Sequence, residues 1–136
     1  MEDCLFCKIA SKEIPANIVY EDEKTLAFLD INPINYGHTL VIPKEHSTNI
    51  FDIQADAWAA TTETARKLAT TIRNVTEADG VNININNGGA AGQMIFHPHI
   101  HIIPRYEEQS LKPWPKKKYE ENEEEEMADK IRNELA

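Results

Sequence analysis

The chain has 136 residues, 41% of them hydrophobic, and a net charge of −9 at pH 7. This length suits one domain around a single core. The composition argues against a membrane protein, because no apolar run approaches the length of a membrane span. It also argues against a nucleic-acid partner, because residues 1–118 (12 basic, 15 acidic) and residues 119–136 (2 basic, 8 acidic) are both acidic. The first residues lack the pattern of a signal peptide, so we expect a soluble cytoplasmic protein.

The N-terminal part of the chain alternates short apolar runs with turn residues. Residues 4–12 predict a short helix, which Pro15 ends. Three strands are expected after it, separated by polar turns and by an Asn- and Pro-rich loop, at residues 18–20, 25–30 and 38–42.

The central part predicts one long helix and two further strands. Apolar and small side chains recur at three- and four-residue spacings between residues 52 and 75, which is typical of an amphipathic helix. Residues 81–86 alternate aliphatic side chains with asparagine and predict a strand with one buried face, and residues 97–105 predict the last strand. We therefore expect an α+β fold: an antiparallel sheet with a long helix and a short N-terminal helix on one side.

The C-terminal part changes in composition. Residues 112–118 are basic and Pro-rich, as in an extended linker, and residues 119–136 are acidic with good helix formers. Met127, Ile131 and Leu135 recur every four residues along this last segment. We expect one domain over residues 1–118 and an acidic C-terminal helix or tail over residues 119–136. The helix would dock through its apolar stripe, and the alternative is a disordered tail.

Three of the five histidines lie at alternate positions of the last strand: His97, His99 and His101. Alternation places their imidazoles on one face of the strand. Neighbours two apart lie about 7 Å from each other, so His99 and His101 can serve one ligand. His97 and His101 lie about 13 Å apart, too far to share a metal ion, and the triplet is expected to serve two sites.

The two cysteines of the chain are separated by two residues, as Cys4 and Cys7. In a chain without a signal peptide they do not indicate a secreted disulfide scaffold. A redox Cys-x-x-Cys motif normally follows a strand, and no strand is expected before residue 4. Metal ligation is the specific interpretation that remains.

The alternating histidines, with Gly92-Gln93 upstream, resemble the histidine triad family of nucleotide hydrolases and transferases. The resemblance extends from the cysteine segment to about Arg105. It implies the fold of that family, a homodimer whose subunits share one continuous sheet, and a purine nucleotide as ligand. It also implies that the middle histidine, His99, attacks the α-phosphate to form a nucleotidyl-histidine that water hydrolyses.

The same resemblance implies the roles of further residues. An aspartate before the third strand would accept hydrogen bonds from the ribose hydroxyls, apolar side chains would hold the base, and donors would contact the phosphate. In this sequence the positions are Asp30 for the ribose, Phe6, Ile31 and Leu40 for the base, and His38, Asn86, Gln93 and His101 for the phosphate.

Two departures from the family pattern affect the expected reaction. Met94 stands where many members carry a Ser or Thr that can donate to the leaving group, which leaves efficient phosphoramidase activity open. His97-Pro98-His99 is similar to the His-Pro-His of galactose-phosphate uridylyltransferases. That branch has Gln as its third member, so His101 favours a hydrolase.

Some bacterial members of the family resemble this chain in a Cys-Cys-His-His zinc site, here Cys4, Cys7, His46 and His97. Two thiolates and two imidazoles suit tetrahedral zinc and leave no open position for catalysis, so a structural role is expected. The leading hypothesis is a hydrolase that releases a nucleoside monophosphate from its leaving group. The alternatives are a dinucleoside polyphosphate hydrolase of the Ap4A type and a zinc-stabilised nucleotide-binding adaptor with little turnover.

Overall fold

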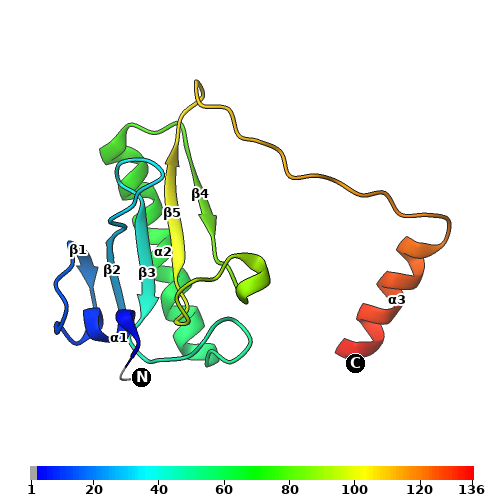
Figure 1. The fold of residues 1–136 in the computed structure, drawn as a ribbon, viewed down its shortest axis with the longest axis horizontal. Helices are drawn as coiled ribbons and strands as arrows, with labels where there is room; N and C mark the ends of the chain where they lie inside the picture. Colours follow the sequence, from blue (N-terminus) through cyan, green and yellow to red (C-terminus); the bar gives the residue numbers. More distant parts are fainter. Residues whose placement is uncertain (1–2) are drawn as a thin grey trace.

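The structure, a computed structural model that describes residues 3–136, has helices at both ends of the chain and a sheet between them (Figure 1). Its elements in chain order are α1 (Leu5–Ala10), β1 (Ile18–Glu21), β2 (Thr25–Leu29), β3 (Thr39–Pro43), α2 (Ala55–Thr76), β4 (Gly80–Asn84), the 3-10 turn η1 (Gly89–Ala91), β5 (Ile100–Arg105) and α3 (Glu123–Leu135). The strands form one antiparallel sheet in the order β1-β2-β3-β5-β4. This confirms the predicted α+β fold with a long helix and a short N-terminal helix.

The sheet is buried on both faces. Ala27, Val41 and Ile102 pack in one apolar cluster with α2, whereas the alternate residues Phe28 and Leu40 pack in a second cluster with α1. Since successive side chains of a strand point to opposite faces, α1 and α2 cover opposite faces of the sheet. The expectation that both helices lie on one side is wrong. β2 and β3 are continuous apolar runs, and such runs carry no alternation that could assign their faces.

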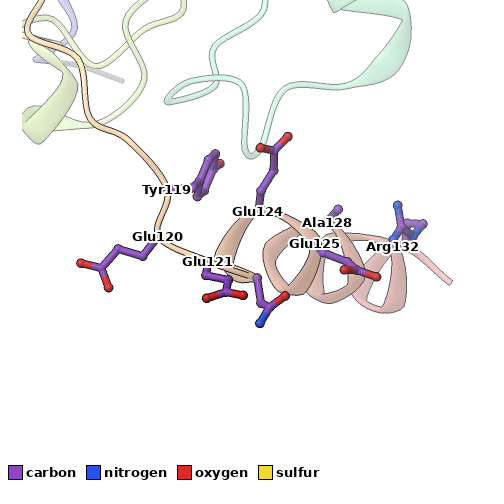
Figure 2. A pocket seen from close by; sticks show the side chains of 8 residues that line it. Tyr119, Glu120, Glu121, Glu124, Glu125, Ala128 and Arg132 are labelled. Carbon is purple, nitrogen blue, oxygen red and sulfur yellow. The ribbon is translucent and has the colours of Figure 1, made fainter.

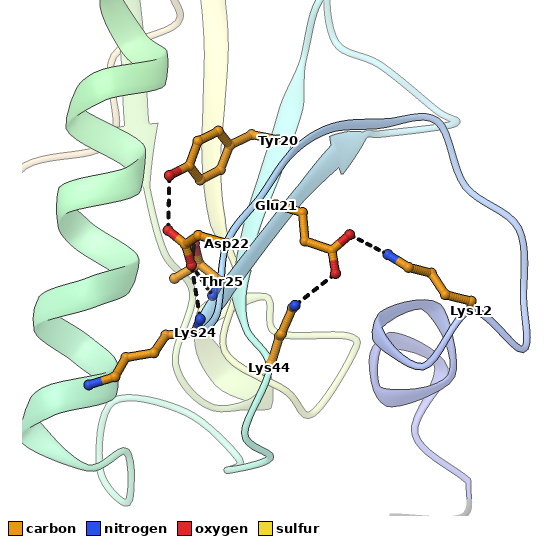
Figure 3. Close-up of polar contacts among 7 residues, drawn as sticks. All are labelled: Lys12, Tyr20, Glu21, Asp22, Lys24, Thr25 and Lys44. Atoms are coloured by element: carbon orange, nitrogen blue, oxygen red, sulfur yellow. Dashed lines mark hydrogen bonds and ion pairs between the residues drawn. The ribbon is translucent and has the colours of Figure 1, made fainter.

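Polar contacts hold the β1–β2 hairpin and the segment after α1 in place (Figure 3). The carboxylate of Asp22 accepts hydrogen bonds from the backbone N–H groups of Lys24 and Thr25 at 2.9 and 2.7 Å. Glu21 forms ion pairs with both Lys12, just after α1, and Lys44, just after β3. These exposed pairs add little stability, but they tie three segments together at one end of the sheet.

The histidine-rich segment only partly belongs to the last strand. β5 begins at Ile100, after Pro98, as expected for a residue that has no backbone N–H to donate to the ladder. On the neighbouring edge strand, the expected buried face is incomplete: Ile83 is 50% exposed, because no strand of the described residues pairs with the outer edge of β4. The free edge leaves room for another chain.

The C-terminal helix is present but stands apart from the sheet (Figure 1). Residues 106–122 contain no helix or strand and lead away from the body of the molecule. The stripe of Met127, Ile131 and Leu135 is 44%, 55% and 81% exposed, so the stripe through which the helix is expected to dock is not covered by residues 3–136. Among the helices described, none combines the length and the apolar character that crossing a membrane requires.

Candidate functional site

A cavity of about 440 Å³ opens on the sheet face that α1 covers. Six of the residues predicted to contact a nucleotide line it: Phe6, Asp30, Ile31, Leu40, His99 and His101. The rest of the wall is largely apolar and includes Ile14, Pro15, Ala16, Leu29 and Ile95, which the sequence analysis missed. These residues lie in loops or at a strand end, where no periodic pattern marks a side chain as part of a pocket.

His99 is buried, and its hydrogen bond defines its tautomer. Its Nδ1 lies 2.8 Å from the backbone carbonyl oxygen of His97. A carbonyl can only accept, so Nδ1 carries the proton and Nε2 keeps a free lone pair. Burial lowers the pKa of His99, although the hydrogen bond to His97 and the charge of Asp30 act in the opposite direction. The imidazole is therefore neutral at pH 7 and nucleophilic at Nε2.

A second pair of imidazoles lies beside it. The backbone N–H of Ile34 donates to His38 Nδ1 at 3.1 Å, so a neutral His38 carries its proton on Nε2. That nitrogen lies 2.9 Å from His101 Nδ1, which must then accept. The proton of His101 is left on Nε2, so His101 can donate to a ligand. Burial, together with the nearby His99 and His38, lowers the pKa of His101 to about 4.

The turn before β3 delivers His38 to this pair. Gly37 has a φ of +98°, a conformation that L side chains rarely adopt, and a Cβ there would lie 2.7 Å from Thr76 Cγ2. Burial lowers the pKa of His38, against the opposing effect of the nearby Asp30. Asp30 Oδ2 lies 3.6 Å from His38 Nε2, and its other oxygen accepts from the backbone N–H of Asn32. Asp30 therefore presents one carboxylate oxygen beside the histidine pair.

The structure does not support the predicted role of the Gln93 side chain. It is 3% exposed, and both amide hydrogens are engaged, one with the carbonyl of Thr48 at 2.7 Å and one with that of Ile95 at 3.0 Å. Its Oε1 accepts from Asn49 and from the backbone of Gly88. Gln93 therefore holds the 88–95 loop in shape and has no hydrogen left for a phosphate. Spacing identified the right loop but could not reveal the direction of the side chain.

Asn86 lies at the start of the same loop. A Cβ on Gly92 would lie 3.6 Å from its Nδ2, so the two residues are neighbours. Among residues 3–136, the Asn86 amide forms no hydrogen bond with another residue. The predicted contact with a phosphate stays open for this residue.

Next to the cavity, four side chains converge as a sulfur and nitrogen cluster. The thiols of Cys4 and Cys7, at the start of α1, meet His46 Nδ1 and His97 Nδ1, and the four atoms lie within 4.8 Å of one another. The separation of the two nitrogens is 3.3 Å, and the sulfur–nitrogen separations include 3.3, 3.4 and 3.6 Å. Tetrahedral zinc, with ordinary bond lengths, would place such atoms about 3.3 Å and about 3.6 Å apart.

The chemistry of the donors agrees with a metal ion. His97 is fully buried, and its Nε2 lies 2.7 Å from the carbonyl oxygen of Pro43, so the Nδ1 lone pair faces the cluster. Burial and the hydrogen bond to Cys4 raise the pKa of Cys7 to about 11, because two neighbouring thiolates are unfavourable without a cation. A bound metal would supply that cation, and its binding would release protons. These four residues can hold one ion.

Comparison with known proteins identifies the family of this chain. Residues 11–108 match the HIT domain family. Over 109 residues the chain is 44% identical to a protein of Arabidopsis thaliana named "Adenylylsulfatase HINT3", a match that covers 80% of this chain and 55% of that protein.

Two solved structures are also similar. A crystal structure of SMU.412c from Streptococcus mutans is 40% identical, with a TM-score of 0.93 over 100% of this chain and 87% of that one. A zinc-bound histidine triad family protein from Mycobacterium smegmatis is 42% identical, with a TM-score of 0.78 over 82% of this chain and 81% of that one. On its sequence match and on its fold, the chain belongs to the histidine triad (HIT) family.

Proposed function

We propose that this HIT protein is a nucleotide hydrolase that cleaves a nucleoside monophosphate, of the AMP type, from its leaving group through a nucleotidyl intermediate on His99. The observation that carries the proposal is the tautomer of His99: its Nδ1–H is held by the carbonyl of His97, and the residue lines the cavity with Nε2 free. The naming of a 44% identical relative as an adenylylsulfatase supports nucleotide hydrolysis in general.

The proposed reaction has two displacements at phosphorus. The Nε2 lone pair of His99 attacks the α-phosphorus, a bond forms between them, and the bond to the leaving group breaks with its electron pair. Water then attacks the same phosphorus, loses a proton, and returns the bonding pair to Nε2. His101, with its proton on Nε2, lies 5.0 Å from His99 between ring centroids and can donate to the phosphate oxygens as charge develops.

The cavity suits the nucleoside half of such a substrate. Its apolar wall, with Phe6, Ile31 and Leu40, can cover the faces of a purine base, while the carboxylate of Asp30 can accept from ribose hydroxyls. These contacts would orient the α-phosphate toward His99, which is how binding energy contributes to a displacement.

The cluster of Cys4, Cys7, His46 and His97 is proposed to hold a structural zinc ion. All four donors belong to the protein, so the ion would have no free position for substrate and would join α1 to the segment before β5. His97 would then serve twice, with its ring in the metal site and its backbone carbonyl on His99. The zinc-bound relative supports this part of the proposal.

The protein is further proposed to act as a homodimer joined through β4. This strand is an edge of the sheet, and it exposes half of Ile83. An unpaired strand edge with an apolar side chain is a ready surface for a second sheet, and pairing of two identical edges gives an isologous interface.

The test is a substrate panel with wild-type protein and His99→Ala. Adenosine 5′-phosphosulfate, adenosine 5′-phosphoramidate and diadenosine tetraphosphate are each offered, and release of AMP is measured. We expect His99→Ala to reduce turnover at least about 10³-fold while AMP binding is kept, because the loss affects the chemical step. Asn74→Ala, on the exposed side of α2, is the control and should behave as wild type.

The panel also separates the alternatives. Preference for diadenosine tetraphosphate would indicate a dinucleoside polyphosphate hydrolase, and AMP binding without turnover of any substrate would indicate an adaptor. A nucleotidyl adduct trapped on a residue other than His99 would contradict the proposed mechanism.

A further inference from the structure

The last 27 residues of the chain, 110–136, form a C-terminal arm that contributes nothing to the core of its own chain. The last hydrogen bonds between this end of the chain and the body join Gln109 to Asn35. Within the described residues 3–136, every later hydrogen bond or ion pair of the arm stays inside the arm. Ala128 is the one residue of the arm with intermediate burial, and the others are exposed.

The arm nevertheless carries the side chains of a packed element. Met127, Ile131 and Leu135 form one stripe of α3, and Trp114 in the linker is 88% exposed. A helix of 13 residues has little stability in water by itself, and tertiary packing of an apolar face normally supplies the rest. No side chain caps the N-terminus of α3, and the four glutamates of its first turn add only the modest stabilisation of exposed charges near a helix N-terminus.

A shallow hollow lies at the start of α3. Figure 2 shows Tyr119 and Glu124 beside the first turn of the helix, with Ala128 and Arg132 further along. All the residues that line this hollow belong to the arm. The body of the same chain contributes no residue to this hollow, and the exposure of Met127, Ile131 and Leu135 shows that it does not cover the stripe either.

The arm has the same position in a relative. It makes up about a fifth of the chain, and the superposition on the Streptococcus mutans structure includes it, with a TM-score of 0.93 over the whole chain. The match to the Mycobacterium smegmatis structure, which covers 82% of the chain, reaches 0.78. A TM-score of 0.93 over the whole chain requires that the arm has the same position relative to the body in both proteins. An arm that keeps one position so far from its own body needs another surface that holds it.

We propose that this surface is a second copy of the same chain, so that two copies exchange their C-terminal arms and each α3 docks through its stripe on the other copy. α3 lies beyond β4, on the side of the free sheet edge (Figure 1). A copy joined through β4 would occupy the space between the body and α3. The inference uses the proposed dimer edge but not the proposed chemistry.

The linker has the length and stiffness for this exchange. Residues 110–120 contain no helix, strand or turn, and Pro113 and Pro115 flank Trp114. An extended chain of these 11 residues, with two prolines, reaches about 34 Å, which is about the width of a neighbouring domain of this size. A stiff linker also opposes a return of α3 onto its own domain.

The decisive experiment mixes ¹³C-labelled and unlabelled chains and records isotope-filtered NOEs. We expect NOEs from the methyl groups of Met127, Ile131 and Leu135 in the labelled chain to protons of the unlabelled chain. NOEs confined to the labelled chain would show that the arm folds back and would overturn the proposal, and so would the absence of any long-range NOE from the stripe.

A matched pair of variants measures the contribution of the stripe. Ile131→Asp and Asn133→Asp each add one acidic group to α3, but Asn133 lies on the face opposite the stripe. We expect Ile131→Asp to raise the dimer dissociation constant at least about tenfold, since a buried isoleucine is lost. Asn133→Asp should change it less than about threefold. Equal effects of the two variants on the dissociation constant would contradict the proposal that the stripe is the docking surface. This result does not depend on which substrate the enzyme cleaves.

Discussion

At the scale of single residues, one hydrogen bond to each ring assigns different properties to chemically identical histidines. The carbonyl of Pro43 holds Nε2 of His97, so its Nδ1 faces the thiols. The carbonyl of His97 holds Nδ1 of His99, so the opposite nitrogen is free. The backbone N–H of Ile34 donates to Nδ1 of His38, so His38 carries its proton on Nε2. This proton is directed at Nδ1 of His101, which leaves the Nε2–H of His101 as a donor. The backbone thus prepares similar side chains for the proposed roles of metal ligand, nucleophile and donor.

Met94 is the residue whose substitution should change the choice of leaving group. It lines the cavity and is 86% exposed, and its thioether cannot donate a hydrogen bond. We expect Met94→Ser to raise turnover of adenosine phosphoramidate relative to phosphosulfate by about tenfold, the value of one hydrogen bond gained in the transition state. Met94→Ala is the control, and an equal gain from alanine would contradict the role of the hydroxyl.

The buried histidines also make stability depend on pH. An unfolded chain protonates His101 below about pH 6.5, whereas the folded protein resists protonation until about pH 4. Between these values the unfolded state binds more protons, so the free energy of unfolding falls as the pH is lowered. Urea titrations at pH 7.5 and 5 should show this fall. The decrease in the free energy of unfolding should be smaller in His101→Asn. A decrease of the same size in this variant would exclude His101 as its source.

At the scale of elements, the short helix α1 depends on the residues around it. Its six residues are too few to be stable alone. Cys4 is its N-cap, and Cys7 lies in its first turn. Phe6 and Ile9 pack against β2 and β3. The element that closes the cavity is therefore held by an apolar contact on one side and by the sulfur and nitrogen cluster on the other.

Removal of the cysteines should release this helix more than it alters the chemistry. We expect about one zinc per chain in wild-type protein purified without a histidine tag, and none in Cys4→Ser/Cys7→Ser. The double variant should melt about 5–10 °C lower, because metal binding contributes to folding. A chelator should lower the melting temperature of wild type but not of the variant. Wild-type protein that is free of metal and indifferent to chelator would refute the site.

At the scale of the whole molecule, the sheet has two edges that differ in what they offer. Neither β1 nor β4 has a strand partner on its outer side among residues 3–136, but β1 forms ion pairs through Glu21 with neighbouring segments. The arm extends past β4. Both features support the proposed association through the β4 side of the molecule.

Charge placed on β4 should therefore weaken the dimer. We expect Ile83→Lys to raise the dissociation constant about tenfold or more, measured by sedimentation equilibrium, because two like charges would face each other across a two-fold axis. Val19→Lys is the matched control, since Val19 lies on the opposite edge strand with a similar exposure of 47%. A monomeric mass for wild type at micromolar concentration would contradict the dimer.

The sequence by itself determined the elements of the sheet, the long helix and the grouping of the chemistry-bearing residues. A period of two is enough to align His99 with His101, and a two-residue gap is enough to bring Cys4 and Cys7 together, because both are local geometry. The family pattern added His46 and Asp30, which local spacing does not connect to either group.

The tertiary structure alone decided the rest. Both amide hydrogens of Gln93 go to loop carbonyls, and α1 lies on the face opposite α2, because these depend on which surfaces meet after folding. The same holds for α3: the four-residue repeat predicted its helix correctly, but a repeat says nothing of what covers it. Side-chain direction, sheet face and docking partner are set by contacts between residues far apart in the chain, and no local pattern encodes them.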